Sequence, residues 1–332
     1  MALDVEVTIS LSKPTGNVGT WFPLLFVVDS TAEADLYGEY TELDELVTAG
    51  YAADSSVYKA AELLFLQEDA PAKIAVYKQK TFSTDGLAKY LNKGWRQLVL
   101  LDDAQNTNAA ALAAYIEGTD KMLFLSVSDK SALTTLYETV KTYDRTFVVY
   151  HTGGKNEAAA VVGVTAGLEA GGFTYKNMII KGVEPMELSD TELEEIHALG
   201  ANTIVEKAGD IVTSEGKTAA GEYADIVDSN DYIIQNIAYK TQKIFNNNNK
   251  VPYTNAGIGM LEAEVQAVLS NGYKNGMIAE DDDGKPLYAT SFALRSQTTE
   301  VDRATRNYPY GKFNFELAGA IHTAKINGTV TV

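Results

Sequence analysis

Between Ser83 and Tyr150 the sequence alternates short apolar runs with amphipathic segments, and this alternation limits the possible folds more than any other feature. The apolar runs cover residues 97–101, 122–127 and 146–150. The amphipathic segments before them cover residues 84–92, 108–117 and 130–141. Apolar strands separated by helices are typical of a parallel sheet that helices cover on both faces. The sequence therefore predicts an α/β fold, α+β overall, with a central, mostly parallel sheet and flanking helices.

The segments on either side extend this pattern. The predicted strands cover residues 22–29, 74–77 and 173–184. The predicted helices cover residues 41–49, 55–66 and 156–169. Ser55 and Ser56 are both suitable N-caps for the second of these helices. We therefore expect an α/β region over residues 21–183.

After residue 183 the pattern changes. Ser189 and Glu192 form a capping box at the start of a helix that ends near His197. The other predicted elements are two strands around Ala208 and Gly209, helices over 222–246 and from 254 or 255 to 271, and a strand over 287–298. We expect a C-terminal core region over residues 184–311.

Both ends of the chain carry the alternation of a strand with one dry face. At the start, the apolar positions are Val5, Val7, Ile9 and Leu11. Near the end they are Phe313, Phe315, Leu317, Val330 and Val332. Asn327 and Gly328 form a typical hairpin turn between the last runs. We expect a strand and linker arm over residues 1–20 and a strand arm over residues 312–332.

The linker between the first strand and residue 21 contains Pro14, Gly16 and Gly19, which argue against a tight hairpin. Nine extended residues reach roughly 30 Å, so the first strand need not lie beside the second. Each terminal strand is then either paired within its own subunit or held by another chain.

Composition excludes several functions. The formal net charge of −18 disfavours nucleic-acid binding and anionic membrane surfaces. The chain has no cysteine, hence no disulfide and no thiolate metal site. Its longest apolar run, Trp21–Val28, is too short to span a bilayer, and Asp4 and Glu6 stand where a signal peptide would have basic residues. We expect a soluble cytoplasmic product.

Polar residues follow the predicted parallel strands, where α/β proteins bind ligands. They are Asp102, Asp103, Ser126, Ser128 and His151. Such residues also cap helices, and this structural role is the favoured interpretation. The three histidines lack partners at metal-ligand spacing, and the glycine motifs fail the phosphate-loop and dinucleotide patterns. We expect no catalytic, cofactor or metal site, with an enzyme using Asp102, Asp103 and His151 as the alternative.

Motifs in a consistent order over about 300 residues resemble the sheath proteins of contractile phage tails and phage-tail-like particles. The first are LDVEVTISLSKPTG and WFPLLFVV, followed by AAVVGVTAGLEAGGFTYKNMIIKGVEP. The strongest is GANTIVEKAGDIVTSEGKTAAGEYADIVDSNDYIIQNI, followed by KVPYTNAGIGMLEAEVQAVL and GAIHTAKINGTVTV. The resemblance is to a compact branch of this family, without added outer domains.

The resemblance implies a structural subunit of the virion, assembled in the bacterial cytoplasm and not an enzyme. Such subunits form hexameric rings stacked in a helical sheath around the tail tube, with baseplate and terminator proteins at the ends. Their contraction drives the tube through the host envelope. Another virion tail component is the further alternative.

The resemblance also implies that neighbouring subunits exchange terminal strands to complete an α/β core domain. Carried onto this chain, the exchanged positions are Val5, Val7, Ile9, Leu11, Phe313, Phe315, Leu317, Ile321, Ile326, Val330 and Val332. The positions that would face the tube are Lys240, Lys243, Arg303 and Arg306.

Overall fold

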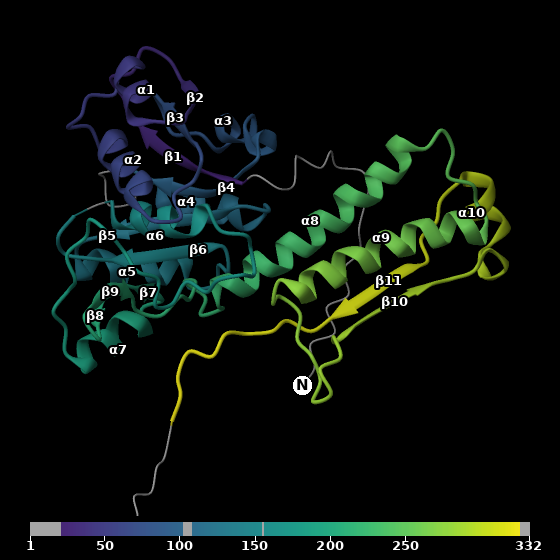
Figure 1. Cartoon of the computed structure of the whole chain (residues 1–332). Helices are drawn as coiled ribbons and strands as arrows, with labels where there is room; N and C mark the ends of the chain where they lie inside the picture. Colours follow the sequence, from purple (N-terminus) through teal and green to yellow (C-terminus); the bar gives the residue numbers. More distant parts are fainter. Residues whose placement is uncertain (1–20, 102–107, 155, 326–332) are drawn as a thin grey trace, which may run out of the picture.

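The computed structural model describes residues 21–101, 108–154 and 156–325. They form an α/β region and a second region of two long helices and a small sheet, which extends away from the first (Figure 1).

A seven-stranded sheet forms the centre of the α/β region, in the order β2-β3-β1-β4-β5-β6-β7. Its strands are β1 (Phe22–Val28), β2 (Leu36–Tyr40), β3 (Ile74–Gln79), β4 (Trp95–Leu100), β5 (Met122–Val127), β6 (Thr146–Tyr150) and β7 (Ala201–Asn202). Only the edge strand β2 runs antiparallel to its neighbour. The predicted, mostly parallel sheet is confirmed. The sequence pattern misses β2, because LYGEY is half-exposed and lacks an apolar run.

Helices cover both faces of this sheet (Figure 1). They are α1 (Leu43–Thr48), α2 (Ser56–Leu66), α3 (Thr84–Ala88), the 3-10 turn η1 (Leu91–Lys93), α4 (Ala109–Glu117), α5 (Lys130–Val140), α6 (Glu157–Ala166) and α7 (Asp190–Ala198). Strand side chains alternate between two cores: Val99 and Phe124 pack with α2 and α6, whereas Leu98 and Leu123 pack with α4 and α5. Burial on both faces explains the uniformly apolar strands.

Helix α6 packs closely against α2 at Gly163. A Cβ atom built on Gly163 would lie 2.7 Å from the carbonyl oxygen of Leu64 and 2.8 Å from its Cα. These are backbone atoms, so a side chain here requires the two helices to move apart. The small-residue sequence of α6 therefore serves close packing.

We predict that Gly163→Ala destabilises the protein although alanine favours helix. Overpacking costs about 1–3 kcal/mol, which outweighs a helix-propensity gain of about 1 kcal/mol. The control is Gly259→Ala in α9 (Asn255–Lys274), where a Cβ meets nothing within 4 Å. Urea unfolding should show Gly163→Ala below wild type and Gly259→Ala above it. Equal stabilisation by both would contradict the packing argument.

The main sheet continues past the expected boundary near residue 183. Strand β7 pairs in parallel with β6, and α7 covers it, with Ser189 forming the predicted capping box with Glu192. A hairpin of β8 (Ile204–Lys207) and β9 (Asp210–Thr213) follows, with positive φ at Ala208 and Gly209 as that turn requires. The α/β region thus reaches the start of α8 (Ala224–Asn247).

The second region is built on α8 and α9, which pack along each other. Its other elements are β10 (Tyr288–Phe292), the 3-10 turn η2 (Arg295–Gln297), α10 (Glu300–Thr305) and β11 (Gly311–Phe315). Strands β10 and β11 form an antiparallel two-stranded sheet. A small core joins this sheet to the helices through Ile233, Val268, Leu269 and Ile278.

Two strand predictions need correction. Residues 173–184 run beside β9 but form only one bridge, between Ile179 and Val212, because positive φ values at Asn177 and Gly182 interrupt the extended backbone. The strand expected over 287–298 ends at Phe292, and η2 and α10 follow it.

Candidate functional site at the base of helix α8

Two side chains that the sequence places at a possible enzyme site, His151 and Ser126, form hydrogen bonds that stabilise the fold. The Nδ1 atom of His151 accepts a hydrogen bond from the Gly153 N–H (3.0 Å), and Nε2 lies 2.8 Å from the carbonyl oxygen of Glu184. The Oγ atom of Ser126 accepts from the Ala158 N–H in the first turn of α6 (3.0 Å). Both side chains therefore hold loops and a helix end in place.

Asp102 and Asp103 lie outside the described residues. Among the residues that are described, no group of three or more His, Asp or Glu side chains is placed to hold a metal ion. Over the same residues, no helix has the length and apolar character that crossing a membrane requires.

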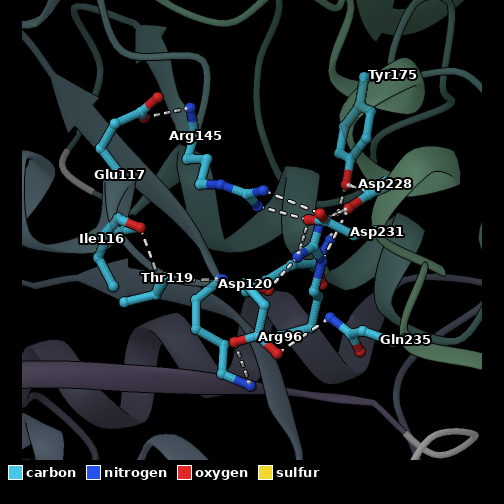
Figure 2. A network of polar contacts seen from close by, with 12 residues as sticks. Arg96, Ile116, Glu117, Thr119, Asp120, Arg145, Tyr175, Asp228, Asp231 and Gln235 are labelled. Carbon is cyan, nitrogen blue, oxygen red and sulfur yellow. Dashed lines mark hydrogen bonds and ion pairs between the residues drawn. The ribbon is translucent and has the colours of Figure 1, made fainter. Parts of the chain in front are cut away.

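The most unusual cluster lies where the α/β region meets α8 (Figure 2). Arg96 projects from β4 and is 2% exposed. Its Nε and Nη2 atoms donate to Oδ1 of Asp228 at 3.0 and 2.6 Å, and its Nη1 lies 2.6 Å from Oδ2 of Asp231. The third partner is the carbonyl oxygen of Asp120. Both aspartates come from α8 at i and i+3, on one face of the helix.

A second arginine and a tyrosine complete the cluster (Figure 2). Arg145, just before β6, donates to both carboxylate oxygens of Asp231 at 2.5 and 2.9 Å. The hydroxyl of Tyr175 donates to Oδ2 of Asp228 at 2.6 Å and accepts from the Gln97 amide at 3.1 Å. Two buried carboxylates thus face two guanidinium groups, so the charges compensate each other.

The ion pairs hold Asp231 in its charged form. Burial would raise the pKa of Asp231, but the charges and hydrogen bonds of Arg96 and Arg145 outweigh it and lower the pKa below its ordinary value of 3.8. The buried carboxylates of Asp228 and Asp231 likewise raise the pKa of Arg96, against the effect of its own burial. The cluster is thus a set of buried charges that depend on one another.

Further contacts join the two regions around this cluster. The ring of Trp21 meets that of Tyr232 edge-on, with centroids 5.9 Å apart. The Tyr232 hydroxyl donates to Glu169 at 2.9 Å, and the same carboxylate oxygen accepts from the Asn275 amide at 2.9 Å. The amide of Gln235 donates to Asp120 at 3.1 Å. We infer that the two regions are held as one body.

Sequence reasoning missed this cluster. Its signals are an arginine inside an otherwise apolar strand, WRQLVL, and two aspartates three residues apart in a long helix. Either signal alone is common, and Arg96 and Asp228 are 132 residues apart in sequence. Only the fold brings them together.

The residues predicted to lie on exchanged strands fall into three groups. Val5, Val7, Ile9, Leu11, Ile326, Val330 and Val332 lie outside the described residues. Phe313 and Phe315 lie in β11 and pair with β10 of the same chain, and Leu317 forms a bridge with Ile278. Their backbone and side chains contribute to the small core of the second region. Ile321 differs, being 91% exposed.

The C-terminal end of α8 and helix α10 lie at the end of the second region that is far from the α/β region (Figure 1). The predicted tube-facing residues belong to these elements: Lys240 and Lys243 to the last turns of α8, and Arg303 and Arg306 to α10 and its C-cap. Lys240 and Lys243 line a hollow between α8 and α9 with a volume of about 600 Å³. Arg303 lies in α10 and donates to the carbonyl oxygen of Thr298, and Arg306 ends that helix with a φ of 58°. Phe245, Met260, Leu294 and Val301 expose apolar surface on neighbouring elements.

We predict that Asp231→Asn destabilises the protein by about 3–5 kcal/mol at pH 7, because it leaves buried arginine charge uncompensated. Since the folded pKa lies below 3.8, Asp231 contributes stability above that pH, and this contribution is lost as the pH falls through the folded pKa. The difference between wild type and variant should therefore shrink below about pH 4. Thermal unfolding of wild type and variant at pH 7 and pH 3 measures this difference in stability.

A matched surface change, Glu138→Gln at the exposed pair with Lys141, should leave the pH 7 melting temperature unchanged. A variant as stable as wild type at pH 7 would refute the assigned role.

The sequence comparisons concern the second region. Residues 224–330 match the family model of the C-terminal domain of the E217 tail sheath protein gp31-like family. This match begins at the first residue of α8. Among curated proteins, none matches the chain significantly.

Solved structures extend the likeness to the whole chain. The helical sheath of the anti-feeding prophage in its contracted state has a TM-score of 0.72 at 14% identity, covering 99% of this chain and 98% of that chain. The contracted sheath complex of the extracellular contractile injection system PVC also has a TM-score of 0.72 at 14% identity, covering 100% and 98%. A sheath tail protein from Listeria innocua has a TM-score of 0.57 at 10% identity, covering 84% and 90%.

The resemblance seen in the sequence motifs thus agrees with the family match over residues 224–330 and with the fold over the full length. The chain has the fold of contractile sheath proteins, and residues 224–330 match the family model of a tail sheath C-terminal domain.

Proposed function

We propose that this protein is the structural subunit of a contractile sheath, which polymerises around a tail tube and contracts to drive the tube through a host envelope. The sheath match over residues 224–330 and the full-length sheath fold support this role. Ser126 and His151, two of the described side chains considered for an enzyme site, make hydrogen bonds that hold the fold. The particle would be a phage tail or a related contractile device, assembled in the bacterial cytoplasm.

The observation that carries the proposal is the small, half-exposed sheet of the second region. Among the strands that the structure describes, β10 and β11 pair only with each other. Their apolar side chains facing the helix core, Tyr288, Phe292, Phe313 and Phe315, are only partly buried. A two-stranded sheet is marginal by itself in water. Additional strands beside β10 and β11 would cover these side chains and pair backbone groups at the edges of the sheet.

Strands from neighbouring subunits suit these edges. In strand addition, backbone hydrogen bonds supply affinity and alternate apolar side chains supply register. Val5, Val7, Ile9 and Leu11 have this alternation at the start of the chain. At the other end, the segment after Leu317 contains Ile321, Ile326, Val330 and Val332. We propose that these two segments are the donated ones, and that β11 stays with its own subunit.

Exchange of this kind is head-to-tail, and such contacts form open helical polymers when the rotation does not close. We propose hexameric rings stacked in a helical sheath, with the tail tube inside and baseplate and terminator proteins at its ends. Contraction would then be a switch between two packings of rigid subunits.

The far end of the second region is the proposed tube-facing surface. Lys240, Lys243, Arg303 and Arg306 supply positive charge there in a chain with a formal net charge of −18, beside the acidic side chains of Glu264, Glu300 and Asp302. Exposed apolar side chains beside them add the contact area that a protein interface uses. A tube surface with acidic and apolar groups would complement this end.

We predict that removing residues 1–12 or 320–332 leaves a folded subunit that does not polymerise. Both deletions keep β10, β11 and all of the core residues that the structure describes, so thermal unfolding should stay cooperative. Electron microscopy of the purified proteins should show hollow cylinders of sheath width for the full chain only. Cylinders from both shortened proteins would exclude strand exchange, and discs or narrow tubes from the full chain would favour another tail component.

We predict that Lys240→Glu with Lys243→Glu abolishes binding to the tail tube while self-assembly persists. The double reversal places acid where the proposed contact needs positive charge. Lys59→Glu with Lys89→Glu, both on exposed positions of the α/β region, is the matched control. Co-sedimentation of sheath polymer with purified tube distinguishes the two. If both double variants bind the tube equally, the assignment of this surface is wrong.

A further inference from the structure

We propose that the first turns of α8 bind one residue near each end of the chain, Trp21 and His322, which we call the roots of the terminal segments. Each segment then leaves the subunit from a fixed point. This inference rests on the proposed sheath function and adds to it the residues that aim the donated strands. It concerns described residues only, on the two sides of the buried ion cluster.

The N-terminal root is Trp21, which directly follows residues 1–20 in the chain. Its ring meets Tyr232 of α8 edge-on, with 5.9 Å between centroids and an interplanar angle of 83°. The guanidinium of Arg96 lies 5.3 Å from the centre of the same ring. Because Asp228 and Asp231 fix Arg96, the tryptophan is held by groups that are themselves immobilised.

The C-terminal root is His322. Its ring meets Tyr223, the N-cap residue of α8, edge-on with centroids 4.8 Å apart, and its Nε2 lies 2.9 Å from Oγ1 of Thr174. The adjacent Ile321 is 91% exposed. Over residues 319–325, His322 is partly buried whereas its neighbours, Ile321 included, are exposed.

The two roots are related by the geometry of α8. Tyr223 and Tyr232 are nine positions apart, which corresponds to two and a half turns and about 13 Å along the axis. They therefore lie on roughly opposite sides of the helix. Asp228 and Asp231 lie between them and tie this stretch to β4 and to Arg145. The two roots and the ion cluster thus share one rigid helix base.

A fixed root has a direct consequence for strand donation. A flexible segment spreads its end over a volume that grows with its length, which lowers the concentration of the strand at a neighbour's sheet edge. Docking Trp21 and His322 shortens the free part and sets its direction. The same docking lets tension in a donated strand pass into the body of the subunit.

The variants Tyr232→Ala and His322→Ala test this proposal. Light scattering measures the subunit concentration above which each variant and the wild type polymerise, and electron microscopy checks that cylinders form. We expect each variant to raise this concentration about tenfold, the equivalent of one good aromatic contact. Tyr232→Phe keeps the ring and removes only the hydrogen bond to Glu169, so it should polymerise like wild type.

The matched control is Tyr239→Ala, seven residues after Tyr232 in α8 and away from Trp21, His322 and the ion cluster. It should polymerise at the wild-type concentration. His322→Ala changes only the tail contact, so it keeps the test decisive if Tyr232→Ala melts early. Wild-type polymerisation by both alanine variants would overturn this inference. Failure of wild type itself to form cylinders would instead count against the proposed function.

Discussion

The buried ion cluster between Arg96, Arg145, Asp228 and Asp231 is the interaction on which the rest of the structure depends. Without the aspartates of α8, two arginines would be buried at the sheet without counter-charge, which costs several kcal/mol. Without α8, the second region would lose its ionic attachment to the sheet. The cluster therefore ties α8 to the α/β region, and it fixes the direction in which α8 leaves the sheet (Figures 1 and 2).

A rigid subunit with a small, half-exposed sheet suits a polymer built by strand exchange. Among the described residues, the sheet of β10 and β11 has two strands with half-buried aromatic side chains, so an added strand would bury more apolar surface. The α/β region, by contrast, has filled cores on both faces of its sheet. Under the proposed function, movement in the polymer would be concentrated in the connections between subunits, while each body keeps its internal packing.

The sequence predicts much of this fold because its signals are local. Apolar runs such as MLFLSV at β5 and the capping box of Ser189 depend on neighbours within a few residues, and both are confirmed. The ion cluster escapes prediction because Arg96 and Asp228 meet only after the chain has folded. The alternation around Phe313 is equally local. It predicts a strand but not the chain that supplies the pairing strand. In the structure, β11 pairs with β10 of the same chain. Conversely, irregular backbone at Asn177 breaks a segment whose composition resembles a strand.

The most direct test of strand exchange is a cryo-electron microscopy map of the polymer at a resolution that traces the chain. We expect additional strands beside β10 and β11, traced to neighbouring subunits through residues 5–11 and the segment after Leu317, with the Arg96–Asp231 contact unchanged. A map in which the sheet stays two-stranded, or in which both added strands trace to the same subunit, would contradict it.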